Sequence, residues 1–152
     1  MSQYFDLGEQ TLWNPSNGAA RLFLRQVSVF EDELGVPSGI GPMRDNECQI
    51  DPVDLKTFVD ALLEQHLSTD HAVVIALSEG FVASMLVLAE RAGIQLTWPG
   101  GAATPLDQNR DIQVPAASGT TTARARLDRL RDASRALSGL ADRMARGRGP
   151  HG

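Results

Sequence analysis

The sequence predicts an α+β fold, in which a small antiparallel sheet packs with three helices and is followed by a disordered linker and a C-terminal amphipathic helix. Three observations predict this class. Short alternating apolar stretches lie near the N-terminus, three later segments carry apolar residues at three- and four-residue spacing, and residues 99–122 hold few large apolar groups. The 152 residues leave room for one domain of ordinary size and a tail.

The predicted sheet has three strands. Residues 4–7 and 11–13 form a hairpin around Gly8-Glu9, because glycine at the first turn position suits a type II′ turn. Residues 94–98 alternate apolar and polar side chains before Pro99. A third strand is therefore expected there, paired with the hairpin.

The first helix is predicted where apolar residues recur from Ala19 to Leu34, and Gly35 ends it. The turn WNPSNG precedes it. A helix N-terminus there would suit an anion, but a phosphate loop needs a longer glycine-rich cradle and a lysine. The turn therefore indicates a strand-to-helix joint, with Asn14 or Ser16 as the N-cap.

Two further helices follow an irregular connection over about residues 35–50. Asp51 is expected to cap the second helix, with Pro52 in its first turn. The third helix, within residues 70–93, is apolar nearly all round and is expected at the centre of the fold. Gly93 marks its end.

Charge divides the chain into an acidic body and a basic tail. Residues 1–122 carry 6 basic and 16 acidic side chains, whereas residues 123–152 carry 8 basic and 3 acidic ones. The division predicts a globular domain over 1–98 that folds by itself, a flexible linker over 99–122 and a helical tail over 123–152. Because an acidic body repels nucleic acid and anionic membranes, neither is an expected partner.

The cysteine usage and the absence of a leader favour a cytoplasmic protein without a cofactor. Cys48 is the only cysteine, and no charged-then-apolar leader or run of about 18 apolar residues marks export or membrane insertion. The neighbouring Glu47 would raise the pKa of this thiol, so a structural or incidental cysteine is expected.

The strongest catalytic candidate is Ser78. In ALSEG, small residues two before and two after this serine suit the nucleophile elbow of a serine hydrolase. The same span fits a continuous helix, and the base would have to be His151 at the C-terminal end. The helix is therefore the preferred interpretation.

Two metal sites are weighed and set aside. One combines metal-ligand side chains near the end of the second helix: Glu64, His66, Asp70 and His71. The two histidines are five residues apart across a helix break, which is not the spacing of ligands on one helix face. An acidic stretch over residues 45–54 lacks the glycine and the closing glutamate of a calcium loop.

Protein–protein contact is the predicted function. The acidic residues expected to form a partner-binding patch are Glu31, Asp32, Asp45 and Glu47. The tail adds an apolar stripe that must be covered by something: Leu127, Leu130 and Leu137. The sequence thus predicts a non-enzymatic binding or accessory protein that contacts another protein or forms a homodimer through its tail. The alternatives are a small serine hydrolase using Ser78 and a nucleic-acid or membrane binder acting through the tail.

Three stretches together resemble a family of short, acidic, functionally uncharacterised proteins from high-GC Gram-positive bacteria. They are QYFDLGEQTLWNPSNGAARLF, PSGIGPM and SEGFVASMLVLAERAG. The resemblance covers about residues 3–98 and implies no activity and no catalytic or binding residue.

Overall fold

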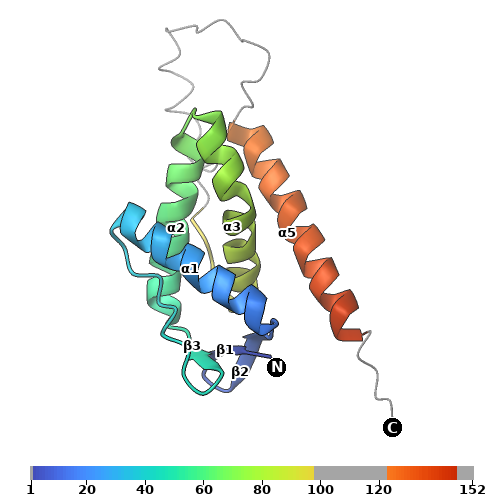
Figure 1. The fold of residues 1–152 in the computed structure, drawn as a ribbon. Coiled ribbons are helices and arrows are strands. Elements are labelled where there is room, and N and C mark those ends of the chain that lie inside the picture. Colours follow the sequence, from blue (N-terminus) through green and yellow to red (C-terminus); the bar gives the residue numbers. More distant parts are fainter. Residues whose placement is uncertain (1, 98–122, 147–152) are drawn as a thin grey trace, which may run out of the picture.

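The fold is α+β, as predicted. The computed structural model describes residues 2–97 and 123–146, with side chains of the last helix described over 125–139. Along the chain the elements are β1 (Tyr4–Leu7), β2 (Gln10–Trp13), α1 (Asn17–Leu34), β3 (Glu47–Gln49), α2 (Pro52–Ser68), α3 (Ala72–Arg91) and α5 (Ala123–Arg146). Figure 1 shows α1 crossing the paired helices α2 and α3, while α5 runs beside α3. The predicted linker falls almost wholly outside the described residues.

The sheet is mixed, with strand order β2-β1-β3. The predicted hairpin of β1 and β2 is confirmed, and Gly8 adopts the positive φ of 61° that its turn requires. The third strand is β3, which pairs parallel to β1 and sets Cys48 beside Phe5. Both of these side chains are fully buried. The expected antiparallel strand over 94–98 was therefore wrong, and a strand lies instead in the connection predicted to be irregular.

Residues 94–97 form no strand because their backbone is used elsewhere and both edges of β1 are already occupied. The Ile94 amide donates to the Ala89 carbonyl at 3.0 Å, which closes the end of α3 around Gly93. The Thr97 amide donates to Asp60 Oδ1 at 2.8 Å on α2. Trp98 lies outside the described residues.

Local signals for the helix ends are confirmed. Ser16, the second of the two N-cap alternatives, accepts a hydrogen bond from the Ala19 amide. Asp51 Oδ1 accepts from the amides of Val53 and Asp54 at 2.9 and 3.0 Å, with Pro52 in the first turn of α2. Gly35 ends α1 with φ 64°. The WNPSNG turn is thus a joint, and its capping serine satisfies a free amide of the helix N-terminus.

The central helix is α3, as predicted. Its Phe81 ring lies 5.9 Å from the Phe23 ring and stacks on the Phe30 ring at 4.4 Å, which joins α3 to α1. Among the described residues, α3 is the one helix that could cross a membrane by length and composition, a span that the sequence analysis had not expected. Eight of its residues are nevertheless buried in this fold, where it serves as the core helix.

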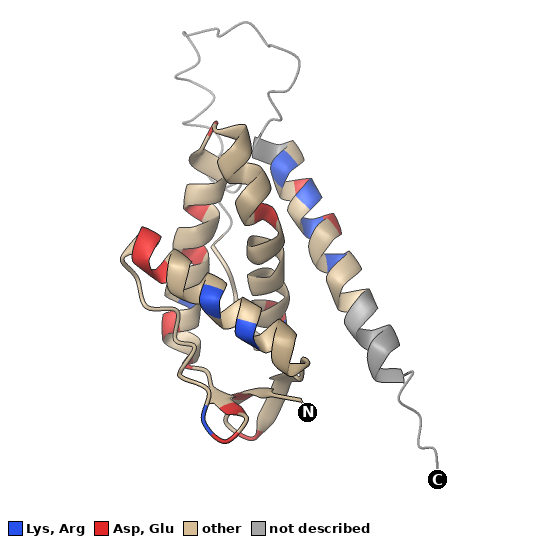
Figure 2. Ribbon diagram, viewed as in Figure 1, with Lys and Arg blue, Asp and Glu red and all other residues tan. Residues whose placement is uncertain are grey.

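The helix α5 packs on α3, which covers part of its apolar stripe. Leu130 is fully buried within the core cluster, and Leu127 is 8% exposed. Figure 2 shows the arginines and aspartates of this helix beside a body with many acidic positions. The first half of the apolar stripe of α5 is thus covered by the globular part of the same chain.

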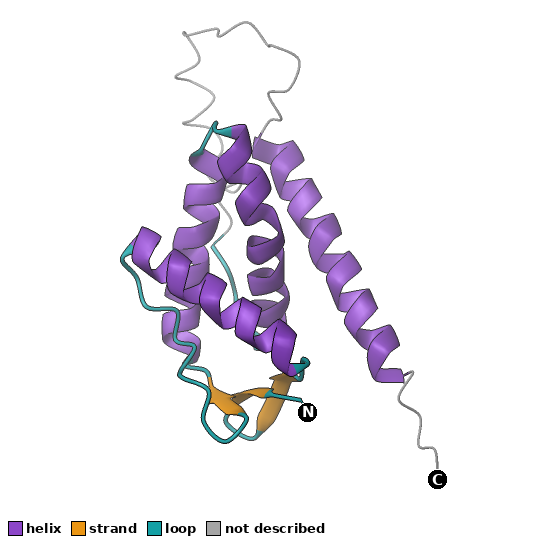
Figure 3. Cartoon of the chain, in the orientation of Figure 1, coloured by secondary structure: helices purple, strands orange, loops and turns teal. Residues whose placement is uncertain are grey.

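The sheet lies at one end of the helices (Figure 3). The core consequently runs from the hairpin, through Phe5 and Leu12, into the space between the helices. One side of α3 remains open between α1 and α5, and the candidate site is found there.

Candidate functional site

Ser78 does not occupy a nucleophile elbow. The helix α3 continues through it from Ala72 to Arg91, whereas an elbow requires a strand followed by a sharp turn. The Ser78 hydroxyl is buried and donates to the Val74 carbonyl at 2.7 Å. A buried hydroxyl bonded to its own helix is not presented to a substrate, so the geometry does not support the hydrolase. His151, the base considered for it, lies outside the described residues.

The structure instead brings His66, from α2, to Ser78. The distance from His66 Nδ1 to Ser78 Oγ is 2.9 Å, and His66 is 4% exposed. The Ser78 hydroxyl also lies 2.7 Å from the Val74 carbonyl, so the tautomer of His66 that satisfies both contacts carries its hydrogen on Nδ1. A general base would accept a proton at this position. The pair is therefore a buried link between α2 and α3, and the sequence pattern gave no signal of it, because His66 was expected at a solvated helix end.

Two arginines of α5 contact α2 and α3 near His66 and Ser78. The buried Arg126 guanidinium donates to the carbonyls of Leu67 and Thr69 at the end of α2, and Arg129 forms an ion pair with Glu79 at 3.1 Å. Burial is the main cause that lowers the pKa of His66. The Glu79 carboxylate opposes that shift, while the positive charges of Arg126 and Arg129 add to it.

His66 should make the protein less stable in mild acid. Because its pKa in the folded protein lies below the ordinary 6.5, the unfolded chain takes up the proton at the higher pH. The free energy of unfolding is expected to be highest above pH 6.5 and to fall as the pH drops through 6.5 toward the folded pKa.

Denaturant unfolding at about pH 7.5 and about pH 5.5 would measure this loss, on either side of the ordinary histidine pKa. In His66→Gln, an amide replaces the titrating ring, and the acid-induced loss should be smaller. The other two histidines are common to both proteins and cancel in the comparison. An equal loss of stability in the parent protein and in His66→Gln would show that His66 is not the group responsible.

The two histidines considered as metal ligands have other partners. His66 faces Ser78, and the His71 ring accepts a hydrogen bond from the Val74 amide as the N-cap of α3. In the part of the chain that the structure describes, no three histidine, cysteine, aspartate or glutamate side chains gather as a metal site.

Cys48 is an inert thiol. Its Sγ donates to the Gly41 carbonyl at 2.8 Å, and the residue is fully buried. Burial, with a smaller effect from the Asp6 carboxylate, raises the pKa of Cys48 to about 11. The thiol is therefore protonated at neutral pH and a poor nucleophile.

The four acidic residues predicted to form one patch lie at two places. Glu31 and Asp32 are at the C-terminal end of α1, whereas Asp45 and Glu47 are at the turn before β3 (Figures 1 and 2). The Glu31 carboxylate is also engaged, because it accepts hydrogen bonds from the amide and hydroxyl of Ser38 at 2.9 and 2.5 Å. The structure thus separates the predicted patch into two pairs.

The tail residues also separate into two groups. Leu127 and Leu130 are buried on the body, whereas Leu137 is 38% exposed. Leu137 borders an apolar cleft together with Trp13, Phe23, Val87 and Leu88. Of the three predicted contact leucines, Leu137 is therefore the one that a partner can reach most readily.

This cleft continues an uncovered face of α3. Four positions at helical spacing share that face, and we call them the α3 groove: Val73, Leu77, Ser84 and Val87. Val73 is 58% exposed and Leu77 is 76% exposed, and Ser84 and Val87 line the cleft. Sequence reasoning placed the whole of α3 in the core and so missed this face.

Comparison with known proteins gives one match. The model of a family of unknown function (DUF6086) matches residues 1–146. No curated protein and no solved structure matches the chain. The family match runs from β1 through α5, well beyond the residues 3–98 on which the resemblance rests.

Proposed function

The chain belongs to this family of unknown function, and from that premise we propose that it is a non-enzymatic protein that binds another protein through the α3 groove. The observation that carries the proposal is the exposure of Leu77 and Val73 on the helix that forms the core of the fold. Single exposed apolar residues are common on protein surfaces. An apolar row that runs along a helix into a cleft is typical of an interaction surface.

The proposed occupant is an amphipathic helix of the partner. A helix of 20 residues is about 30 Å long, so the groove offers a partner helix several turns of contact. Its apolar side chains at i, i+4 and i+7 would contact Val73 and Leu77 and then enter the cleft beside Leu137. In this way Leu137 keeps the partner-binding role predicted for it.

Charge favours an acidic flank on that partner helix. Arg21 and Arg25 are exposed, one turn apart on α1, and neither forms an ion pair with a described residue. They stand on an otherwise acidic body, on the helix that crosses α3 (Figure 2). Carboxylates beside the partner's apolar stripe would pair with them and speed the association.

A pair of exposed positions tests the proposal. Leu77→Asp places a charge in the groove, whereas Val53→Asp makes the matched change at a valine on α2 that is 72% exposed. Both variants should keep the thermal midpoint of the parent protein, because neither site is buried. We expect Leu77→Asp to weaken binding of a partner about tenfold or more and Val53→Asp to leave it unchanged, since a central apolar contact contributes about 1–2 kcal/mol or more.

The measurement needs a purified partner. Proteins captured from the native lysate by the parent chain would be expressed alone, and their affinities for the three proteins would be determined by titration calorimetry. A partner whose affinity is the same for Leu77→Asp and the parent would contradict the groove as the binding surface. Light scattering of the parent chain alone would reveal whether a second copy occupies the groove instead.

A further inference from the structure

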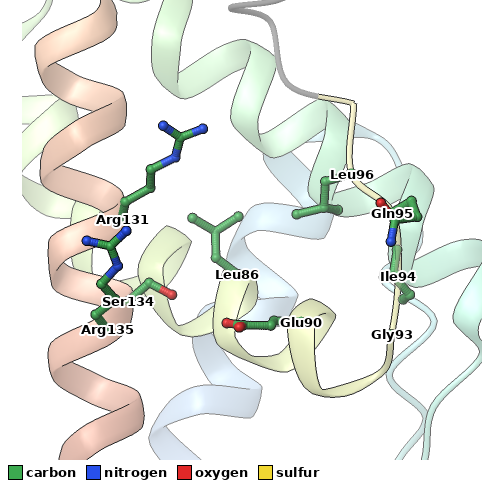
Figure 4. Close-up of a pocket in the computed structure, with 9 residues that line it drawn as sticks. All are labelled: Leu86, Glu90, Gly93, Ile94, Gln95, Leu96, Arg131, Ser134 and Arg135. Carbon is green, nitrogen blue, oxygen red and sulfur yellow. The ribbon is translucent and has the colours of Figure 1, made fainter.

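A second cleft lies on the other side of α5 and has a different chemistry. It occupies about 360 Å³ between the C-terminal end of α3, the segment 93–96 and α5 (Figure 4). Its lining includes Leu86, Glu90, Leu96, Arg131, Ser134 and Arg135. Its volume is at the lower end of the roughly 300–1,000 Å³ typical of small-molecule sites.

The wall formed by α5 carries polar groups that can bind an anion. Arg131 and Arg135 are one helical turn apart, and both line the cleft. Ser134 lies between them, with its hydroxyl directed into the cleft in Figure 4. Although Ser134 is only 8% exposed, this hydroxyl makes no hydrogen bond to any residue that the structure describes. The hydroxyl is thus available at the cleft surface as a hydrogen-bond donor to a ligand.

The carboxylate neighbours of the two arginines on α5 are exposed aspartates. Arg131 and Arg135 lie 3.9 and 3.7 Å from Asp128 and Asp132, in pairs on the exposed side of α5. Such surface pairs contribute little free energy, whereas a carboxylate held by two guanidinium groups forms charge-assisted hydrogen bonds. A ligand carboxylate can therefore displace Asp132 from Arg135.

The wall opposite α5 carries one carboxylate and two leucines, which restrict the other groups that a ligand can have. The Glu90 carboxylate points toward Ser134 across the cleft in Figure 4, and a simple anion would be repelled by it. An ammonium group would pair with it. Leu86, which is 5% exposed, and Leu96 supply an apolar surface for an aliphatic or aromatic group. We propose that this cleft binds a free amino acid with an apolar side chain.

In that complex the ligand carboxylate would contact Arg131, Arg135 and the Ser134 hydroxyl between them. Its ammonium group would contact Glu90, and its side chain would lie on Leu86 and Leu96. Every charged lining group then meets an opposite charge. The proposal concerns a small ligand on the far side of α5 from the α3 groove, so it stands independently of the proposed protein partner.

Titration calorimetry with the full chain at neutral pH tests the ligand class. The probes are leucine and phenylalanine, together with isocaproate and isoamylamine, which retain the leucine side chain but lack the ammonium or the carboxylate. We expect at least one of the two amino acids to bind, and each single-charge analogue to bind about tenfold more weakly than leucine, because a charge-assisted contact is lost. Failure of both amino acids to bind at millimolar concentration would overturn the proposal, as would isocaproate binding as tightly as leucine.

Variants test the placement of the groups. Arg135→Gln should weaken amino-acid binding about tenfold without changing that of isoamylamine, and Glu90→Gln should abolish the preference for leucine over isocaproate. Arg44→Gln, at an exposed arginine in the turn before β3 and outside the cleft, serves as the control and should leave amino-acid binding unchanged. Both cleft substitutions are at exposed positions, and circular dichroism would verify that the variants are folded. Binding that is unaffected by both cleft substitutions would overturn the site.

Discussion

Phe81→Ala is expected to lower the free energy of unfolding by about 3–5 kcal/mol, the largest effect of any single change considered for this protein. Phe81 is 2% exposed and lies in ring contact with Phe23 and Phe30 on α1. Truncation removes both ring contacts and leaves a cavity that the surrounding helices cannot fill completely. The midpoint of urea unfolding, followed by circular dichroism, measures the change.

Leu77→Ala is the matched control for that measurement. It lies one turn before Phe81 on the same helix, but it is 76% exposed, so its truncation should change stability by less than about 0.5 kcal/mol. Equal midpoints for the parent protein and Phe81→Ala would show that α3 is not the core helix.

Leu130→Ala is expected to lower the free energy of unfolding by about 2–5 kcal/mol. Leu130 is fully buried within the core cluster although it belongs to α5, which follows the predicted linker. The loss arises only if α5 and the body unfold together, because a helix that unfolds by itself would not affect the main transition. Urea unfolding followed by fluorescence would report on the body through Trp13, which stacks on Phe5.

The control for α5 is Leu137→Ala, at a leucine of the same helix that is 38% exposed. Its effect should be well below that of Leu130→Ala. If Leu130→Ala leaves the transition of the body unchanged, residues 1–98 form the independent folding unit that the sequence predicts. A large loss would instead place α5 in the same cooperative unit as the body.

The third strand illustrates where sequence reasoning failed. Residues 94–98 carry the alternating pattern of a strand, yet residues 94–97 bond to the end of α3 and to Asp60 instead. The strand that does form, Glu47–Gln49, is three residues long with one buried side chain, Cys48. So short a segment contains less than two periods of alternation, and pairing with β1 rather than local pattern makes it a strand.

The candidate sites depended still more on tertiary contacts. His66 and Ser78 meet because α2 and α3 pack at a particular register. Arg131 and Arg135 line one cleft with Glu90 only because α5 lies on α3. No spacing along the chain encodes distances of this kind. The exposed face of α3 could not be predicted either. The sequence of a helix that is apolar nearly all round does not indicate which side its neighbours leave uncovered.

By itself the sequence determined the fold class, the hairpin, the ends of α1 and α2 and the central place of α3. These features depend on groups a few residues apart, such as Ser16 with the Ala19 amide and Asp51 with the Val53 amide, so the local sequence contains their cause. Only the tertiary structure decided the parallel pairing of β3, the docking of α5 and the positions of the two clefts. Those features result from burial and hydrogen bonding between segments far apart in the chain, where many partners compete and the overall packing selects one.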